Sequence, residues 1–344
     1  MKPHPHAPAT PPRQRGAALL LAMLIVALVA SLSAAAFWQQ WRAWAVEAAE
    51  QQRSQTAWVL TGALDWGRLI LRQDARASSI DHLAEPWAVP LQESQLSTFL
   101  AGNADNATSI NEPGDVALQA FLSGEIHDLQ GRLNLRNLVA SGNTLSEPDW
   151  RAWQRLYRAL GLPESELSAV AQRLRLALEP AQDAASTAPL LPQGWAQVGW
   201  LGLSAHSART LAPYATWLPE RTPLNLNTAS ALALHATIPG LDLAQAQQLV
   251  TQRQRSHFAS VTDAASQVQG LGANAINPQQ HSTSSRYFEI LGQLRLDDSV
   301  TAESSTVVRN GTEVRVLWRQ RAAVPGHAGH RSIAPPVIPA SSLE

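Results

Sequence analysis

The residue types that carry enzymatic chemistry form no recognisable set in this sequence. There is no cysteine, which excludes thiolate catalysis, disulfides and thiolate metal sites. The ten histidines are scattered, and the sequence lacks the motifs of serine hydrolases, zinc proteases, P-loop proteins and dinucleotide-binding proteins. His127 and Asp128 adjoin an expected turn, which we expect Asp128 to cap or close. We therefore predict that the protein is not an enzyme.

Gly16 marks the junction between a basic segment and an apolar one. Lys2, Arg13 and Arg15 precede it, and 21 residues without a charge follow, from 17 to 37. Such a run can cross a hydrocarbon core of roughly 30 Å as a helix. The pattern resembles a type IV prepilin signal, in which a peptidase cuts after the glycine and the helix stays in the mature chain. The alternatives are an ordinary secretory signal, for which the small residues Ser31, Ser33, Ala34, Ala35 and Ala36 resemble a cleavage site, and a plain single-pass anchor.

The charge pattern places most of the chain outside the cytoplasm. The basic residues before the apolar run hold that end in the cytoplasm, so we predict a single-pass protein of the bacterial inner membrane with its bulk in the periplasm. The 344 residues suffice for one large or two modest domains with real cores. Their formal net charge of −1 provides no attraction for nucleic acid.

A long helix is expected to continue beyond the apolar run. No proline lies between residues 13 and 85, so we predict a helix from about 17 to 74, on the order of 85 Å long at 1.5 Å per residue. Trp38, Trp41 and Trp44 would lie at the membrane surface, where indole rings are favoured. The alternative is that these rings are core residues beneath a globular head.

Beyond this helix the sequence alternates between strand and helix patterns. Residues 124–138 and 306–319 each predict a β-hairpin, the second around Asn310-Gly311, and a further strand is predicted near 287–296. Helical patterns fill the sequence between them, at 148–160, 164–178 and 227–269. We therefore predict an α+β fold in which the long N-terminal helix packs on an antiparallel sheet, with a large all-helical domain inserted between strands.

Several short motifs spread over nearly the whole chain form one pattern. They are Arg15-Gly16, Asp81-His82-Leu83 with Glu85-Pro86-Trp87, residues 124–135, Leu218-Pro219 with residues 221–230, and residues 284–288. Together they resemble the K-type minor pseudopilins of the type II secretion system, the GspK family. The resemblance implies a non-enzymatic subunit at the tip of the periplasmic pseudopilus, which it initiates and caps to drive export of folded proteins across the outer membrane.

The resemblance also assigns roles to residues at the start of the helix. Prepilin peptidase would cut between Gly16 and Ala17, and the new amino terminus would be methylated. Leu21 then stands fifth in the mature chain, where most pilins carry glutamate. In the usual model that glutamate neutralises the amino terminus of the subunit already in place, because an unpaired charge among apolar helices is costly. A subunit with leucine can only go first, so Leu21 is the position that defines the tip.

The implied partners are I- and J-type minor pseudopilins, other pseudopilins, prepilin peptidase and the inner membrane. The implied boundaries are a prepilin leader at 1–16, a transmembrane and assembly helix at 17–37, a pilin-like domain at 38–140 and 284–320, an inserted helical domain at 141–283, and a disordered tail at 321–344. A minor pilin of a competence or type IV pilus system is the alternative.

Calcium is a further implication, because some family members bind Ca²⁺ in the inserted domain. The family commonly has an Asp-rich stretch there, whereas this chain has Leu176-Ala-Leu-Glu-Pro180 and a loop rich in Ala, Ser and Pro. Calcium prefers six to eight oxygen ligands, and only Glu179 and Asp183 are near. Asp297 and Asp298 belong to a second acidic patch. These four are the candidate ligands, and no cofactor is assigned.

Residues 222–263 also resemble the helix-hairpin-helix units of competence DNA receptors, so an anchored DNA-binding protein is a second alternative. Such units bind phosphate through backbone N–H groups in a Gly-x-Gly turn. Here Asp242 replaces the second glycine, and the segment 225–281 has no lysine and balances two arginines with two aspartates. Without a basic footprint, affinity for nucleic acid has no source. We therefore predict a helical scaffold for protein contact.

Overall fold

The computed structural model of this chain describes residues 15–96, 120–179, 188–268, 270–272, 274–296 and 299–322. The chain divides into two compact units, one ending at Trp58 and one beginning at Val59, and each is described by itself. The helix α1 (Arg15–Ala77) contributes to both units. The prediction of a long unbroken N-terminal helix is therefore confirmed.

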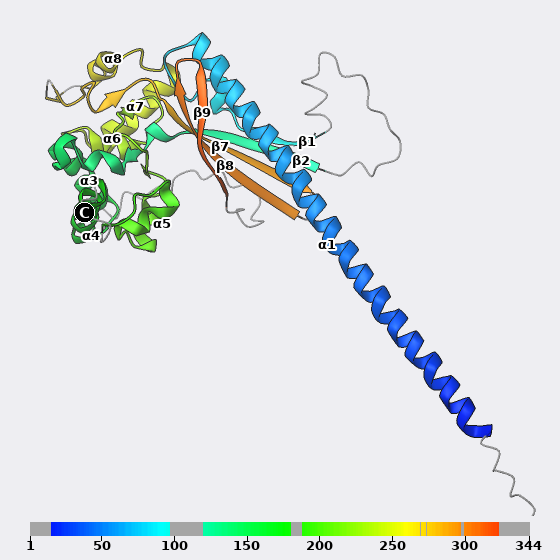
Figure 1. Cartoon of the computed structure of the whole chain (residues 1–344). Coiled ribbons are helices and arrows are strands. Elements are labelled where there is room, and N and C mark those ends of the chain that lie inside the picture. The colour runs from blue at the N-terminus through cyan, green and yellow to red at the C-terminus, as the bar shows by residue number, and fades with distance from the viewer. Residues whose placement is uncertain are drawn as a thin grey trace, which may run out of the picture. The chain divides into compact units, whose positions relative to one another are not determined.

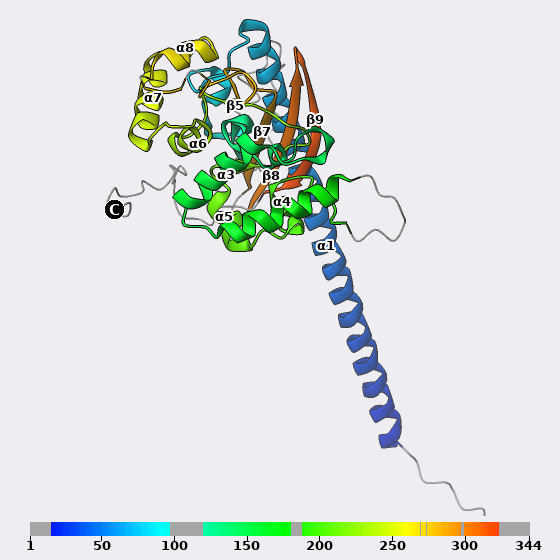
Figure 2. The ribbon, with the colours of Figure 1, turned by 90° about the vertical axis from the view of Figure 1, so that its left-hand side faces the viewer.

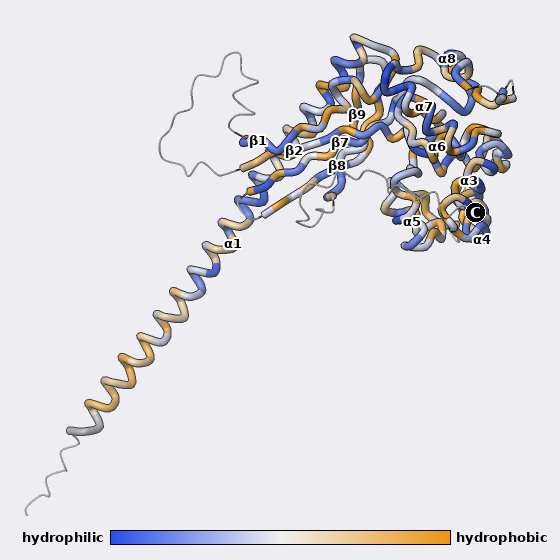
Figure 3. The backbone as a smooth tube through the Cα atoms, turned by 180° about the vertical axis from the view of Figure 1, so that it is seen from behind, coloured by the Kyte–Doolittle hydropathy of each residue, from blue (hydrophilic) through white to orange (hydrophobic). Residues whose placement is uncertain are grey.

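The first unit consists of the N-terminal part of α1. Its apolar residues form the continuous hydrophobic stretch that Figure 3 shows in orange along the helix. Within an 18-residue window of this stretch the mean hydropathy is 2.6, and none of the window is buried within the protein. No interaction with another part of the described chain therefore covers this stretch of the helix.

The second unit contains a five-stranded antiparallel sheet (Figure 1). Its strand order is β1-β2-β7-β8-β9, so β2 pairs with β7 although about 160 residues separate them in the sequence. The strands are β1 (Leu91–Gln95), β2 (Ala120–Asp128), β7 (Tyr287–Leu296), β8 (Ser299–Asn310) and β9 (Glu313–Arg321). The turn at Asn310-Gly311 joins β8 to β9, with Asn310 opposite Glu313, which confirms the predicted C-terminal hairpin.

The C-terminal part of α1 packs on one face of this sheet (Figure 1). Leu60, Leu64 and Leu71 are fully buried there against apolar residues of the strands. The helix and sheet approach closely at Gly67, where an added Cβ would lie 2.7 Å from Cγ2 of Ile290. Burial of this apolar face supplies the main stabilisation, as expected for a helix on a sheet.

The chain between β2 and β7 forms the insert, whose helices gather together in Figure 2. They pack around their own large apolar core, which includes Trp153, Leu156 and Tyr157. The elements are α3 (Glu147–Ala159), α4 (Glu164–Leu178), α5 (Ala205–Leu211), α6 (Ala231–Thr237), α7 (Leu243–Arg255) and α8 (Val261–Ser266). Short 3₁₀ turns lie at Leu129–Gly131, Leu135–Leu138, Ser141–Asn143 and Trp195–Leu201, and a further one, Pro86–Ala88, follows α1.

Two pairs of short parallel strands, β3 (Leu133–Asn134) with β4 (Ala215–Thr216) and β5 (Leu224–Asn225) with β6 (His281–Ser282), complete the insert. The predicted α+β fold with a helical insert between strands is confirmed.

The predicted hairpin at residues 124–138 is wrong. The partners of β2 are β1 and β7, and the chain leaves the sheet after Asp128. Leu133, Leu135 and Leu138 alternate with polar residues because they fill the core of the insert, not because they pair with β2. The same alternation fits both arrangements, so the pattern alone could not identify the partner.

Candidate functional site

The residues predicted for processing and assembly lie at the start of α1. Gly16 and Ala17 belong to its first turn, of which only the backbone is described. The side chain of Leu21 is 60% exposed. Residues 1–14 of the predicted leader lie outside the described residues. The cleavage point and the role of Leu21 therefore stay predictions.

The apolar part of α1 has the properties of a membrane anchor. The large apolar side chains between Leu19 and Leu32 are all at least half exposed within the chain. The helix is long and apolar enough to span a bilayer. Apolar surface of this extent requires cover from lipid or from other helices. It is consistent with a single membrane anchor.

Three tryptophans follow the apolar stretch without becoming part of a core. Trp38, Trp41 and Trp44 are between 56% and 61% exposed, and the rings of Trp38 and Trp41 lie 5.6 Å apart between centroids. The alternative that they form a core beneath a head therefore does not fit the structure. Exposed indole rings at this place favour the interface of a membrane.

A buried polar network joins the sheet to the insert, and Asp128 at the end of β2 is its centre. Oδ2 of Asp128 accepts hydrogen bonds from Asn225 Nδ2 (3.0 Å), Thr228 Oγ1 (2.6 Å) and Ser285 Oγ (2.6 Å). Oδ1 accepts from Gln130 N at 2.8 Å, so the predicted capping role of Asp128 is confirmed. This single carboxylate therefore ties the end of a strand to two segments far away in the sequence.

Asn225 extends the same network toward the end of α1. Its side chain is completely buried, and Nδ2 also donates to the carbonyl oxygen of Asp81 at 3.2 Å. Arg309 of β8 donates to the carboxylates of Asp74 (2.9 Å) and Asp81 and to the carbonyl oxygen of Ser285 (2.9 Å). The segment after α1, the start of β7 and the middle of the insert are thus held at one point.

Burial also changes the acidity of the carboxyl groups in this region. It raises the pKa of Asp81 to about 6, although the guanidinium of Arg309 acts in the opposite direction. Burial, assisted by the charge of Glu85, raises the pKa of Asp74 to about 6. The pKa of Asp128 is raised by burial as well, against its hydrogen bonds. Removing a charged group from water disfavours its ionised form.

Sequence reasoning identified most of these residues only as parts of motifs. Asp81, Glu85 and Asn225 carried the family resemblance without an assigned role, and Arg309 was not singled out. The available signal was an arginine inside a strand whose neighbours, Val307 and Val308, are apolar. An arginine that is only 7% exposed in such a strand requires acidic partners.

Of the four candidate calcium ligands, the described part of the chain contains Glu179 alone, so the structure does not test this candidate site. Glu179 lies at the end of α4, where Oε1 accepts a hydrogen bond from Asn143 Nδ2 at 2.9 Å. Asp183, Asp297 and Asp298 lie outside the described residues. Elsewhere, carboxylate oxygens of three buried acidic residues lie within 4.8 Å of one another, but the guanidinium of Arg309 supplies a cation there. We assign no metal ion to either place.

The helix-hairpin-helix-like segment has a turn unsuited to phosphate. Asp242 is the N-cap of α7, and its carboxylate accepts from Gln245 N at 2.7 Å. It therefore occupies one of the N–H groups of this helix N-terminus, and its negative charge lies where a phosphate would have to bind. Arg253 is buried and donates to the carbonyl oxygen of Leu226, so it is not available at the surface. These features disfavour binding of DNA.

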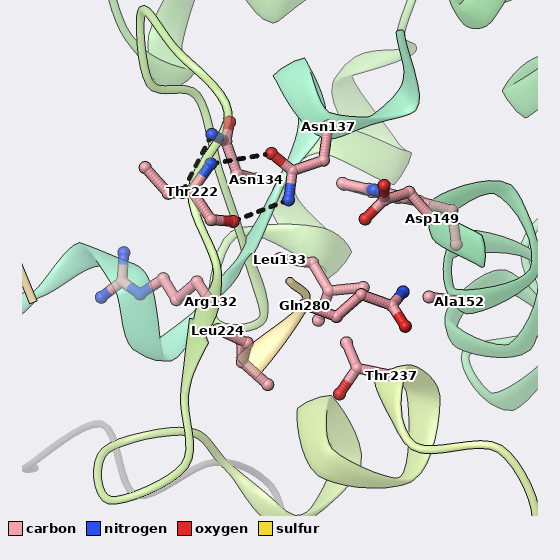
Figure 4. A pocket seen from close by; sticks show the side chains of 11 residues that line it. Arg132, Leu133, Asn134, Asn137, Asp149, Ala152, Thr222, Leu224, Thr237 and Gln280 are labelled. Carbon is pink, nitrogen blue, oxygen red and sulfur yellow. Dashed lines mark hydrogen bonds between the residues drawn. The ribbon is translucent and has the colours of Figure 1, made fainter. Parts of the chain in front are cut away.

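A polar pocket lies within the insert, beside α3 (Figure 4). Asn137 donates to the carbonyl oxygen of Thr222 (2.8 Å) and accepts from its N–H (3.0 Å), and Asn134 donates to the Thr222 hydroxyl at 3.1 Å. Asp149 accepts from Arg221 at 2.8 Å. These polar groups hold the segment before β5 against the start of the insert, which indicates a structural role.

Comparison with known proteins gives consistent results. Residues 224–284 match the family model described as type II secretion system (T2SS), protein K. The chain is 28% identical to type II secretion system protein K of Pseudomonas aeruginosa over 332 residues, covering 89% of this chain and 92% of that protein. It is 26% identical to the protein of the same name from Pectobacterium carotovorum over 344 residues, covering 94% and 99%.

The fold has a counterpart among solved structures. A chain in the crystal structure of the GspK-GspI-GspJ complex from enterotoxigenic Escherichia coli superimposes with a TM-score of 0.60 at 17% identity, covering 80% of this chain and 99% of that one. The fold of most of this chain thus recurs in a solved structure. The chain is thus similar in sequence to type II secretion system protein K over most of its length, and it shares its fold with a chain of the GspK-GspI-GspJ complex.

Proposed function

We propose that this protein is a minor pseudopilin that acts at the tip of the periplasmic pseudopilus of a type II secretion system. One observation carries the proposal: a single continuous helix has an uncovered apolar first part and a second part built into a sheet. The helical insert is a large addition to that sheet. A bulky head fits at the end of a fibre better than inside it. A role at the tip depends on packing between subunits and requires no catalytic step.

The apolar part of α1 would serve successively in the membrane and in the fibre. Before assembly it would hold the protein in the inner membrane, with the head in the periplasm. Prepilin peptidase would cut between Gly16 and Ala17, and the new amino terminus would be methylated. In the fibre, helices of I- and J-type minor pseudopilins and of other pseudopilins would then replace lipid around the exposed apolar side chains.

The first test is the N-terminal sequence and intact mass of the full chain, produced with and without prepilin peptidase. We expect a peptidase-dependent chain that begins at Ala17. Gly16→Phe should abolish this processing, whereas Gly62→Ala, a change in the same helix where a Cβ meets no neighbour, should leave it intact. An uncut chain, or one that begins near residue 37, would contradict the proposal.

The second test concerns the partners. Membranes containing the processed chain and the I- and J-type proteins of the same system should yield a complex on detergent extraction and affinity purification. We expect the complex to form without the major pseudopilin, because an initiating subunit must meet its partners before the fibre grows. Recovery of this chain without both partners would argue against a role at the tip.

A further inference from the structure

The C-terminal part of α1 and the edge strand β9 lie side by side (Figures 1 and 2). Nε and Nη2 of Arg68 donate to the carbonyl oxygen of Val314, at 3.2 and 2.7 Å. Nη2 of Arg319, further along β9, lies 2.7 Å from Oδ1 of Asp65. The two elements therefore run in opposite directions, and we call the line along which they meet the α1–β9 seam.

The outer edge of β9 has backbone groups available for a further strand. In the described sheet β9 is the last strand and pairs with β8. The N–H of Ala322 donates to the carbonyl oxygen of Ala302 at 2.9 Å, so Ala322 faces β8. Because successive residues of a strand alternate in direction, the backbone groups of Arg321 and Arg319 face outward, and they bond to no described residue. Such an edge can pair with a strand of another molecule.

Arginine side chains from both elements line the seam. Arg68, Arg72 and Arg76 stand four residues apart in α1, so they lie on one side of the helix. Arg321 follows Arg319 by two residues in β9 and shares its face of the sheet, the face on which α1 packs. The seam therefore carries five guanidinium groups.

The carboxylates that ion pairs or strand register place beside these arginines do not balance them. Asp65 is shared by two of the arginines, at 3.1 and 2.7 Å, and Glu303 of β8 stands opposite Arg321. Five positive charges thus meet two negative ones. In the part of the chain that the structure describes, Arg72, Arg76 and Arg321 make no hydrogen bond or ion pair.

This excess of positive charge is unfavourable for the head on its own. Like charges four residues apart destabilise a helix. The helix dipole accounts for Arg76, which lies in the last turn of α1, and a charge on an edge strand limits aggregation. Neither effect accounts for Arg72, or for guanidinium groups of two elements along one seam. An anionic group from outside the chain would offset the repulsion.

We propose that the α1–β9 seam binds an acidic, extended segment of a partner pseudopilin. Carboxylates of that segment pair with Arg72, Arg76 and Arg321, and its backbone adds a strand to the outer edge of β9. Because side chains on one face of a strand recur at every second residue, the acidic residues occupy alternate positions. The inference rests on the proposed function, since it names the surface that one of the I- and J-type partners contacts.

The test titrates the full-length chain in detergent with the purified I- and J-type proteins of the same system. Arg72→Glu combined with Arg321→Glu should weaken the complex about tenfold at low salt. The affinity of the wild-type chain should fall several-fold between about 50 and about 300 mM salt, because salt screens exposed charges, and the affinity of the variant should change less. The new Glu at position 72 stands four residues from both Arg68 and Arg76, so it replaces repulsion by attraction in the helix.

The control combines Arg173→Glu with Arg255→Glu, which changes the net charge equally at exposed positions of the insert, and it should bind as the wild type does. Equal affinities of the seam variant and the wild type, or equal losses in the seam variant and the control, would overturn the inference and leave the proposed function intact. If the wild-type chain binds neither partner, the proposed function fails and the inference fails with it. Should the seam variant not fold, Arg72→Gln with Arg321→Gln decides by the same comparison.

Cross-linking gives an independent readout, because the chain has no cysteine. Gln320→Cys, at an exposed position of β9, provides a single thiol beside the seam for a photoactivated cross-linker. Mass spectrometry of the cross-linked complex should identify a segment of the I- or J-type protein with acidic residues at alternate positions. A cross-link to a segment without acidic residues, or an intact complex without a cross-link, would contradict the inference.

Discussion

At the scale of single residues, the carboxylate of Asp128 has the most concentrated set of contacts at the junction. It receives donors from Gln130, Asn225, Thr228 and Ser285. These groups belong to the 3₁₀ turn after β2, to the insert and to the start of β7. A buried carboxylate with this many donors is stable only while all of them remain in place. Its removal should therefore affect all three segments.

We predict that Asp128→Asn lowers the free energy of unfolding by about 2–4 kcal/mol. The amide nitrogen of asparagine would face the donors of Asn225, Thr228 or Gln130, so at least one buried donor loses its acceptor. Urea unfolding of the full chain in detergent measures the effect. Thr228→Val, which removes one donor, should cost only about 1 kcal/mol. Equal costs for the two variants would contradict the central role of Asp128.

His281 is a second residue whose burial has a measurable consequence. The side chain is 1% exposed, Nδ1 accepts the N–H of Asn277, and Nε2 has no partner in the described structure. Burial lowers its pKa to about 4. Its folded pKa lies below its unfolded value of about 6.5, so it contributes stability that is present above pH 6.5 and lost as the pH falls toward 4.

Protonation of His281 should lower the free energy of unfolding of the wild-type protein by up to about 3 kcal/mol between pH 7 and pH 4. We predict that His281→Gln abolishes this part of the decrease. Urea unfolding at a series of pH values provides the measurement, with His206→Gln on the exposed side of α5 as the control. The effect of His281 opposes that of Asp74, whose pKa burial raises to about 6, so the wild-type profile is flatter than either contribution. An unchanged profile in His281→Gln would show that this histidine is not the group responsible.

At the scale of elements, α1 is one continuous helix whose first part is exposed and whose second part packs on the sheet. Its C-terminal part is fitted to the sheet, and Gly67 is the point of closest approach, with Ile290 of β7 opposite. Gly62 lies in the same helix, but a Cβ there would meet nothing within 4 Å. The two glycines therefore allow the packing effect to be separated from the effect of helix propensity.

We predict that Gly67→Ala destabilises the protein by about 1–3 kcal/mol, because the methyl group overlaps a branched, buried side chain. Gly62→Ala should instead stabilise it by about 0.5–1 kcal/mol, because alanine loses less backbone entropy in a helix. Thermal unfolding of both variants tests the contrast. Stabilisation by Gly67→Ala would mean that the sheet yields at Ile290 without cost.

The elements also show what the sequence could and could not predict. The helix α1 and the hairpin of β8 and β9 were predictable because their signals are local. These signals are the absence of proline over the helix and the Asn310-Gly311 pair at the turn. The strand β2 has no local signal for its partner, because β7 lies far away in the sequence and the insert absorbs the leucines that suggested a hairpin. The site at Arg309 depends on long-range contacts, which hydrophobic periodicity does not report.

At the scale of the whole molecule, a small set of buried polar groups joins distant parts of the chain. Asp128, Asn225 and Arg309 connect the segment after α1, the sheet and the insert. The apolar side chains of α1 before Trp38 are left for surroundings outside the chain. This division of roles supports the proposed role of the protein in packing and assembly.

The position of a charged residue along the apolar helix should then decide where the subunit enters the fibre. Leu21→Glu would place a carboxylate where it can pair with the amino terminus of an earlier subunit, so the variant could be added after other subunits. We predict several-fold lower secretion, together with loss of exclusive tip labelling in electron micrographs. The control is Leu24→Glu, which carries the same cost of about 2.5–3.5 kcal/mol for a charge in the membrane but stands one turn further along. If both variants reduce secretion equally and retain tip labelling, the cost of the charge explains the loss and position 21 has no special role.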